Sequence, residues 1–267
     1  MYFHINIKGR YLWMSIYIKE EAFEKILIWL NSKKRGKQGI YCKNTEELRT
    51  FLEGVYFIMR TGAQWRELPK YYGKFKTVHK RFVSWAKKNI WNDMLSFFAQ
   101  DADMESVMID GTSIRAHACA GGYKKGSQNV QALGRSSGGF TTKIHALVDA
   151  LGNPLRFILT PGQVSEIHQA EKLIEGIKGA NILGDKIFDC RHILNQITSQ
   201  ECVPIIPCRS NRIFQRQIDY HLYKERHLIE CFFSKIKHFR RIFSRFDKLA
   251  IAYMAFLSFA SSIIWLK

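Results

Sequence analysis

The residues best suited to chemistry lie in one stretch of the chain, from Tyr223 to Lys237. This stretch contains no Gly or Pro, so we expect it to form one continuous helix. At about 100° per residue, four of its polar residues share one face of that helix: Tyr223, Arg226, Glu230 and Lys237. One carboxylate among a phenol and two cations suits a site that holds a metal ion on Glu230 and phosphates on Arg226 and Lys237.

The opposite side of the same helix is apolar. Its stripe consists of Leu228, Ile229, Phe232, Ile236, Phe239 and Phe243. We expect this stripe to pack on a core, which would aim the polar face at a site. Taken alone, Glu230 is more typical of an ordinary solvated helix face than of a functional site.

Two further carboxylates stand where strands are expected to end. Asp110 follows the apolar segment Ser106–Ile109, and Asp185 follows Asn181–Gly184. In an open α/β sheet, ligand sites form at strand ends. Together with Glu230, these residues make an all-oxygen ligand set suited to Mg²⁺ or Mn²⁺. Two such ions, about 3.5–4 Å apart, activate the attacking oxygen and stabilise the leaving oxygen in phosphodiester displacement.

Each Asp also has an alternative role that is purely structural, because an Asp after a strand is often a turn former or a helix cap. We assign that role to Asp189, four residues after Asp185. Asp189 is expected to cap a helix over 190–200 by accepting a backbone N–H from Arg191 or His192. The second metal ligand is therefore predicted to be Asp185.

The remaining pattern predicts helices followed by a mixed sheet. Apolar spacing of three and four residues indicates helices at 20–30, at 45–60 with Asn44 or Thr45 as its cap, and after Thr77. Strands are expected at 106–109, 141–148, 154–159, 181–184 and 203–206, with helices at 165–178 and 190–200. The order β-β-β-α-β-α-β-α is typical of an α/β fold of the ribonuclease H-like type.

Composition and charge narrow the class of partner. The 267 residues include 46% hydrophobic and 24% charged residues, which describes a globular protein with ample core. A formal net charge of +18 predicts a polyanionic partner, nucleic acid first and an anionic membrane surface as the rival. The six cysteines have no metal-site spacing and are expected to be reduced thiols of an intracellular protein.

Basic residues concentrate in two places. After Thr77, a short helix has Val78, Phe82 and Trp85 on one face and basic residues, Lys80 and Arg81 among them, elsewhere. This arrangement suits helix-turn-helix docking on DNA, or else a solvated basic helix. Between 209 and 248 there are eleven basic residues and four acidic ones, and we expect this side to face DNA, with Arg209 and Arg212 on phosphates.

The apolar run Leu249–Leu266 is long enough to cross a membrane. Ser258, Ser261 and Ser262 interrupt it, and no second span exists in the sequence. We therefore expect a buried helix that covers a face of the sheet, and no membrane partner.

The spacing Tyr223-x₂-Arg226-x₃-Glu230-x₆-Lys237 matches the YREK signature of bacterial insertion-sequence transposases. Asp110-Gly-Thr and Gly184-Asp185-Lys186 resemble the first two acidic blocks of that group. The chain resembles the insertion sequence five family of DDE transposases over roughly residues 15–267. One departure is Ile187-Phe188, where the family usually has a small residue and then Tyr. A bulky Ile beside the metal site would weaken activity.

The resemblance implies an organisation and a reaction. We expect a tail at 1–14, a helical DNA-binding domain at 15–103, and a ribonuclease H-like catalytic domain at 104–267 with a basic loop at 113–140. The resemblance implies binding of double-stranded DNA at the terminal inverted repeats, strand cleavage, joining of the 3′-hydroxyl to target DNA, and a homodimer on paired ends. It assigns two Mg²⁺ or Mn²⁺ ions to Asp110, Asp185 and Glu230, and positioning of the DNA end to Tyr223, Arg226 and Lys237. The alternatives are a DNA-binding remnant that no longer cuts, and a nuclease on the same fold.

Overall fold

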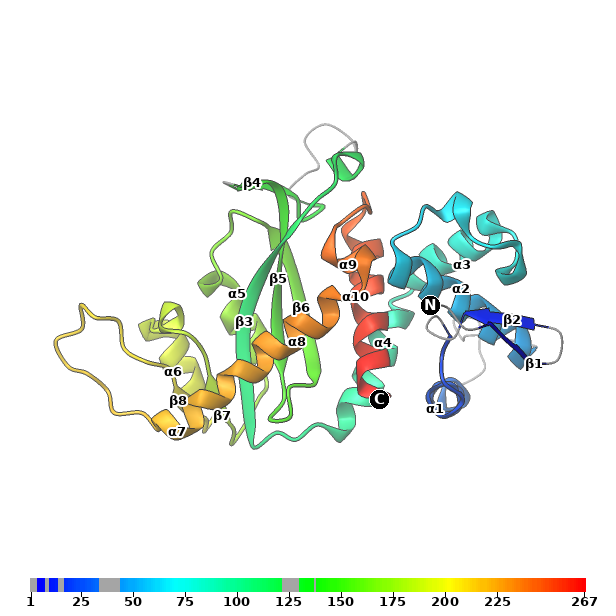
Figure 1. Cartoon of the computed structure of the whole chain (residues 1–267). Coiled ribbons are helices and arrows are strands. Elements are labelled where there is room, and N and C mark those ends of the chain that lie inside the picture. The colour runs from blue at the N-terminus through cyan, green and yellow to red at the C-terminus, as the bar shows by residue number, and fades with distance from the viewer. Residues whose placement is uncertain (1–3, 8–9, 14–16, 34–43, 122–129, 137) are drawn as a thin grey trace.

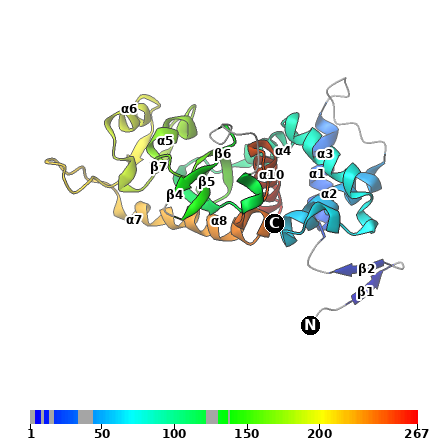
Figure 2. The same cartoon turned by 90° about the horizontal axis from the view of Figure 1, so that it is seen from above.

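The computed structural model describes residues 4–7, 10–13, 17–33, 44–121, 130–136 and 138–267. Its first half is helical. The helices and 3₁₀ turns are α1 (Glu20–Ser32), α2 (Thr45–Thr61), η1 (Trp65–Glu67), η2 (Lys70–Tyr72), α3 (Phe75–Lys87), α4 (Ile90–Phe98) and η3 (Ala99–Asp101). Before them, the strands β1 (His4–Ile7) and β2 (Arg10–Trp13) pair as an antiparallel hairpin, which stands away from the helices in Figure 2.

Local signals set the ends of α2. The Asn44 side chain accepts a hydrogen bond from the Glu46 backbone N–H at 2.9 Å, which confirms the predicted cap. At the other end Gly62 adopts φ +71°, the left-handed conformation that terminates helices and that glycine adopts without strain. α3 begins at Phe75, three residues earlier than expected, and buries the predicted face of Val78, Phe82 and Trp85.

The second half is built on a six-stranded sheet. Its strands are β3 (Ser106–Arg115), β4 (Gly134–Ser136), β5 (Gly139–Val148), β6 (Pro154–Pro161), β7 (Asn181–Leu183) and β8 (Val203–Ile205). β5 pairs antiparallel with β3, β4 and β6, whereas β7 pairs parallel with both β3 and β8. The order is therefore β6-β5-β3-β7-β8, with the short β4 also paired to β5. Three antiparallel strands followed by two parallel ones are the ribonuclease H-like arrangement that the sequence predicts.

β3 and β5 are longer than the sequence indicates. β3 continues through Asp110 to Arg115 and pairs with β5 as far as Arg115↔Thr141. The expectation that Asp110 ends its strand is therefore wrong, because the polar residues after it still form ladder hydrogen bonds. The predicted loop at 113–140 is correspondingly shorter: its ends belong to strands, a 3₁₀ turn η4 (Ala118–Gly121) follows β3, and residues 122–129 and 137 lie outside the described part.

Helices cover both faces of the sheet. On one face α5 (Ile167–Ile174) and α6 (Arg191–Ser199) pack on Val107 and Ile109 of β3 and form one core. On the other face the chain's last helices pack on Met108 and Ile114. These are α8 (His227–Lys237), α9 (Arg240–Phe243) and α10 (Ala250–Trp265). The alternation of β3 side chains between the two cores follows the two-residue period of a strand.

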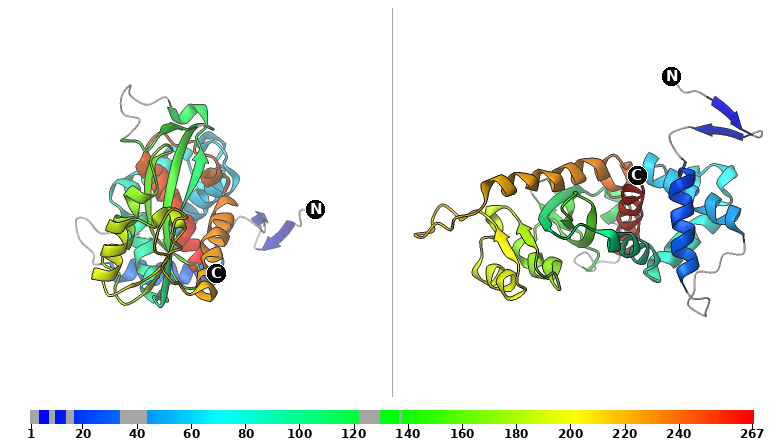
Figure 3. Two further views of the ribbon diagram at one scale, coloured as in Figure 1. Left: turned by 90° about the vertical axis from the view of Figure 1, so that its left-hand side faces the viewer. Right: turned by 90° about the horizontal axis from the view of Figure 1, so that it is seen from below.

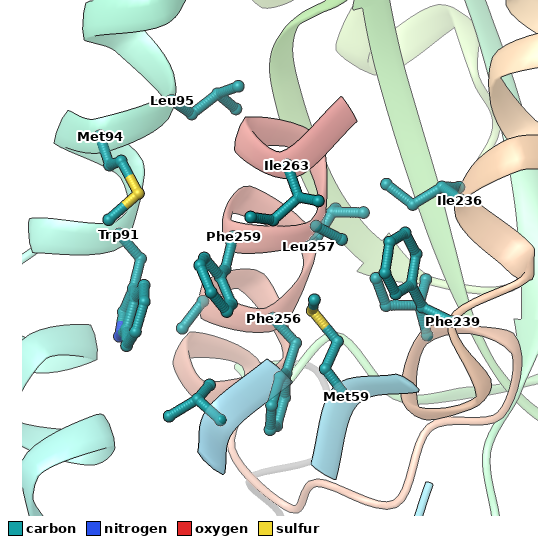
Figure 4. Close-up of a cluster of buried hydrophobic side chains, with 14 of the residues drawn as sticks. Met59, Trp91, Met94, Leu95, Ile236, Phe239, Phe256, Leu257, Phe259 and Ile263 are labelled. Carbon is teal, nitrogen blue, oxygen red and sulfur yellow. The ribbon is translucent and has the colours of Figure 1, made fainter. Parts of the chain in front are cut away.

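α10 joins the two halves of the chain. It runs between α4 and the sheet in Figure 1, and Figure 4 shows Phe256, Phe259 and Ile263 pointing from it toward the surrounding helices. The Phe256 ring lies 4.4 Å from the ring of Phe82 on α3, and the Phe259 ring lies 4.9 Å from Trp91 on α4. At the far end, the Trp265 indole N–H donates to Pro154 O on β6 at 2.7 Å. The predicted buried helix is confirmed, and it covers α4 and α3 as well as the sheet.

No helix in the described parts of the chain is both long and apolar enough to span a membrane.

Because α10 belongs to the core of both halves, Phe256→Ala should destabilise the whole described fold. We expect a loss of about 3–5 kcal/mol in the free energy of unfolding, since the side chain is fully buried. Tryptophan fluorescence and far-UV circular dichroism should follow one coincident urea transition. Ile251→Ala, on the same helix but 41% exposed, is the control and should cost less than about 1 kcal/mol. Two separated transitions in the Phe256 variant would contradict the shared core.

Candidate active site

The helix that carries the predicted site is a continuous run from Tyr220 to Lys237. It consists of α7 (Tyr220–Tyr223), one tighter 3₁₀ turn η6 (Lys224–Arg226) and α8. Asp219 begins the run by accepting the backbone N–H groups of His221 and Leu222 at 2.8 and 3.0 Å. The predicted helix from Tyr223 to Lys237 is therefore confirmed, and in Figure 3 it lies along the sheet.

The apolar side of this helix is buried as expected over its helical length. Ile229, Phe232 and Ile236 are at most 1% exposed. The prediction fails at Phe243, which is 61% exposed. The reason is that α8 ends at Lys237 and the backbone becomes extended at Phe239 (φ −81°, ψ 106°), so Phe243 no longer continues the stripe.

The polar side of the helix lies against β3. The Arg226 guanidinium donates to Asp110 Oδ2 at 3.3 Å and to Glu230 Oε1 at 2.5 Å. Lys237 Nζ donates to Thr112 Oγ1 at 2.8 Å. Two carboxylates separated by 120 positions in the sequence are thus bridged by one cation, and the face predicted from helical spacing is the one that meets the sheet.

Asp185 reaches the same region through the parallel pairing of β3 and β7. The last paired residues are Met108 and Leu183, and each predicted aspartate lies two positions further along its strand direction. Asp185 is half-buried, and its carboxylate accepts the Lys186 N–H at 2.6 Å. The two aspartates therefore lie at the same level of neighbouring strands.

The environment of Asp110 disfavours its negative charge. Burial raises the pKa of Asp110 to about 6, even though the Gly111 N–H and Arg226 stabilise the carboxylate. The carboxylates of Glu166 and Asp185 raise this pKa further. The carboxylates near Asp110 therefore outnumber the one guanidinium beside it. A bound cation would reduce the repulsion between these carboxylates.

Glu166 is a member of the site that the sequence analysis missed. It immediately precedes α5, and a Cβ added to Gly111 would lie 2.9 Å from its side chain, so a larger residue at position 111 would force the Glu166 side chain to move. Lys143 Nζ on β5 pairs with Glu166 Oε1 at 3.2 Å, with both side chains less than a fifth exposed. No sequence signal marks Glu166, because it follows a turn and its partner lies 23 positions away.

Tyr223 lies at the edge of this site. Burial raises the pKa of the Tyr223 phenol, and Arg226 opposes that rise by its positive charge and a hydrogen bond. Of the predicted face, Tyr223 and Arg226 therefore lie near the aspartates, while Lys237 contacts β3 at Thr112.

Asp189 has a different role from the one expected. α6 has Cys190 as its N-cap, with no side-chain capping bond, so the predicted cap is wrong. The Asp189 carboxylate is fully buried and accepts the backbone N–H of Arg209 at 2.9 Å and Nε of Arg212 at 3.0 Å, with Arg216 at 3.5 Å. Burial raises the pKa of Asp189, but these hydrogen bonds and charges outweigh it and hold the pKa below its ordinary value.

The predicted phosphate contacts Arg209 and Arg212 thus make internal bonds in this structure. The Arg209 guanidinium donates to the carbonyl groups of Ile187 and Lys186, at 2.8 and 3.3 Å, directly after Asp185. Arg212 keeps 42% of its side chain exposed. Both therefore lie on a loop attached to the end of the β7 segment rather than among the three carboxylates.

The predicted DNA contacts of the helical half lie apart from the carboxylates, on the other side of α10 (Figures 1 and 2). Lys80 is exposed on α3. The Arg81 guanidinium stacks on Phe51 and Trp85, with 4.4 and 5.3 Å to the ring centroids.

Two of the eleven basic residues between 209 and 248 do not face outward. Arg245 is fully buried and donates to Thr142 Oγ1 at 2.7 Å and to backbone carbonyls, and burial lowers its pKa to about 10. Arg241 is 6% exposed and forms a two-pronged pair with Asp247. The expectation that the whole run faces DNA is wrong for these two.

The donor chemistry of the site fits a divalent cation, since Asp110, Asp185 and Glu230 offer only hard oxygen ligands. In this structure Arg226 lies between two of them, because its guanidinium is paired with both Asp110 and Glu230. Among the residues that the structure describes, no three His, Cys, Asp or Glu side chains lie close enough together to hold a metal ion. A cation at these carboxylates would therefore compete with the guanidinium.

Two family models match this chain. One, described as a putative transposase of the IS4/5 family, matches residues 18–95. The other, described as a transposase DDE domain, matches residues 101–263 and so covers more than half of the chain. The chain belongs to the DDE transposases of the IS4/5 family. The resemblance seen in the YREK spacing is thereby confirmed.

Two individual relatives match parts of the chain. A putative transposase for insertion sequence element IS6501 from Brucella ovis is 42% identical over 132 residues, which are 48% of this chain and 99% of the relative. An uncharacterized protein, y4sN, from Sinorhizobium fredii is 32% identical over 108 residues, which are 40% of this chain and 83% of that one.

Solved transposase structures are more distant. The piggyBac transposase in a synaptic complex with hairpin DNA has a TM-score of 0.41 and 14% identity, over 75% of this chain and 51% of that chain. This DDE transposase therefore spans about half the length of the piggyBac chain. A pre-cleavage Mos1 transpososome has a TM-score of 0.28 and 11% identity, over 87% and 81% of the two chains.

The raised pKa of Asp110 makes stability depend on pH. A carboxyl group that holds its proton more tightly in the folded state favours folding below about pH 4, and this contribution is lost as pH rises through about 6. Asp110→Asn cannot ionise, so in chelator-containing buffer it should be more stable than the parent by roughly 1–3 kcal/mol at about pH 8. The difference should vanish at about pH 4.

Urea unfolding at the two pH values measures this effect. The exposed Asp101, at the end of η3, provides the control, and Asp101→Asn should show no such pH-dependent gain. An Asp110→Asn variant that is no more stable than the parent at the higher pH would contradict the buried, charge-crowded environment.

The contrast between Asp185 and Asp189 gives a second test. Asp189→Ala should lower the free energy of unfolding by about 1.5–3 kcal/mol, because it removes charge-assisted hydrogen bonds at a buried position. Asp185→Ala removes a half-buried carboxylate with one local hydrogen bond and should change stability by less than about 1 kcal/mol. Urea titrations of both variants decide the point, and equal losses would count against the structural role of Asp189.

Proposed function

We propose that this DDE transposase binds the terminal inverted repeats of its own insertion sequence, cleaves a strand at each end and joins the freed 3′-hydroxyl to target DNA. The observation that carries the proposal is the placement of α8 along β3. That placement brings Arg226 to both Asp110 and Glu230 and brings Lys237 to Thr112. A phosphodiester backbone presented to this face would meet cations and carboxylates in one small area.

Asp110, Asp185 and Glu230 are the residues that would hold divalent ions, two Mg²⁺ or Mn²⁺ in our proposal. Such ions supply charge stabilisation for the attacking and leaving oxygens of an in-line phosphoryl displacement. The chain's contribution is a rigid support: Asp110 within a paired strand, Asp185 beside it, and Glu230 on a helix with a fully buried opposite face.

Arg226 connects the carboxylates to the DNA in this proposal. Its guanidinium is paired with Asp110 and Glu230 here, and planar guanidinium groups also bind phosphates with two parallel hydrogen bonds. Entry of DNA and a divalent ion would let Arg226 exchange its carboxylate partners for a phosphate. Tyr223 and Lys237, at the two ends of the same face, would position the DNA end.

The helical half would recognise the repeat. We propose that α3 presents Lys80 and Arg81 to the duplex, and that Arg209 and Arg212 meet phosphates near the catalytic half. The boundaries proposed above, with a helical DNA-binding part at 15–103 and a catalytic part at 104–267, describe function rather than independent folding, because α10 contributes to the core of both. We further propose that two copies act together on paired ends.

Purified protein and a duplex bearing the repeat test the proposal, the repeat being taken from the DNA that flanks the gene. Cleavage should need Mg²⁺ or Mn²⁺ and stop in excess EDTA. Asp110→Asn, Asp185→Asn and Glu230→Gln should each lower the cleavage rate by at least about 100-fold, since even changes around a ligand typically cost 10–100-fold. Binding of the duplex should persist in all three.

Glu225→Gln is the matched control, because it removes a carboxylate from the same helical run but lies on another face. It should cleave at close to the parent rate. A parent protein that binds the repeat but never cuts it would point to an inactive DNA-binding remnant. Cutting without any product joined to new DNA would point to a nuclease.

A further inference from the structure

The segment between β8 and α7, residues 206–219, has an apolar tip that the proposed function does not explain. In Figure 1 this segment is the yellow-orange loop that projects from the end of the sheet. Its tip residues Ile213 and Phe214 are 91% and 89% exposed, the highest values among the exposed large hydrophobic side chains of the described residues. Large apolar side chains are usually buried, so two adjacent ones in solvent indicate a surface that binds something.

The loop is attached firmly to the body of the protein. Buried Asp189 accepts hydrogen bonds from both Arg209 and Arg212, and Arg216 donates to the Ile206 carbonyl at 2.7 Å. The Gln215 amide, next to the tip, donates to the Arg212 carbonyl at 2.9 Å. These bonds hold the chain on both sides of Ile213 and Phe214, so the apolar tip is presented from a fixed base.

The charge around the tip indicates what it binds. Three arginines, Arg209, Arg212 and Arg216, share one buried carboxylate, Asp189, which leaves a net charge of +2 at the base of the loop. Cations beside an apolar tip complement a duplex, in which phosphates flank a stack of apolar bases. A second copy of this chain docked by the same loop across a two-fold axis would instead bring like charges together.

The position of the loop agrees with DNA as the partner. Arg209 donates to the carbonyl groups that directly follow Asp185, and the loop continues into α7 and the helix that carries Arg226. The tip is therefore connected at both ends to elements of the candidate active site. DNA bound at the candidate active site would extend across the adjacent surface, where this loop lies.

We propose that Phe214, supported by Ile213, is a wedge that inserts between base pairs of the duplex held at the active site and unstacks that step. The proposal rests on the proposed function, since it requires that the chain bind duplex DNA. Aromatic side chains replace base stacking without regard to sequence, and apolar wedges at unstacked steps let a protein bend the duplex toward itself.

The experiment places 2-aminopurine at successive positions of the repeat duplex, because the fluorescence of this base rises when it loses its stacking partner. The parent protein should raise the fluorescence several-fold at one position or two adjacent ones. Phe214→Ala should abolish that rise and weaken binding by about 5- to 150-fold. Phe214→Trp should retain the rise.

Leu151→Ala is the control, because Leu151 is a 66%-exposed apolar residue in the turn between β5 and β6. It should leave both fluorescence and affinity unchanged. Phe214→Ala should melt at the parent temperature, since its side chain makes no core contact in the exposed tip.

Three results would overturn the wedge. If the parent binds the duplex and Phe214→Ala changes neither fluorescence nor affinity, the wedge is wrong and the proposed function stands. If Phe214→Ala instead disrupts self-association in sedimentation without DNA, the tip is an interface between copies. A parent protein that binds no duplex would refute both the wedge and the proposed function.

Discussion

The packing of α10 between α4 and the sheet is the contact on which the rest of the structure depends. Phe256 and Phe259 reach into the helical half, while Trp265 is bonded to β6. Without this helix the sheet would lose cover on one face and the aromatic cluster of α3 and α4 would open to water. The orientation of the N-terminal helices relative to β3 is thereby set by close packing rather than by a linker. In the proposed function, a DNA end bound by α3 would meet the carboxylates in a relative position that this packing already sets.

The second constraint is electrostatic and lies where α8 crosses β3. Burial of Ile229, Phe232 and Ile236 holds that helix on the sheet, and the same placement forces Arg226 between Asp110 and Glu230. The two carboxylates would repel one another in a partly buried site, so the guanidinium stabilises the protein in the absence of any ligand. This explains why the residues that suit a metal ion do not form a ready cluster. The fold offsets part of their negative charge with the Arg226 side chain, which is itself suited to binding phosphate.

The sequence predicted most of this fold because its decisive signals are local. The Asn44 cap, the period of the apolar residues in α2 and α8, and the turn between β5 and β6 all act within a few residues. The main incorrect and missed predictions concern residues whose partners are distant in the sequence. β3 runs past Asp110 because β5 pairs with it, and pairing depends on residues more than 20 positions away. Glu166 and the anchoring role of Asp189 escaped for the same reason, since neither residue has a local partner that would mark it.

The net charge of the chain likewise could not predict which cations are available for binding. The excess of cations agrees with membership of a transposase family, yet it did not locate the cations that are available to a polyanion. Arg245 is fully buried against Thr142 and backbone carbonyls, and Arg241 is paired with Asp247, so neither adds to a phosphate-binding surface. Arg226 is paired as well, but with carboxylates that suit a divalent ion, and in the proposed function its partner changes when DNA and the ion bind. A structural arginine therefore differs from a phosphate-binding one in the groups with which it is paired. Only the three-dimensional arrangement reveals those groups.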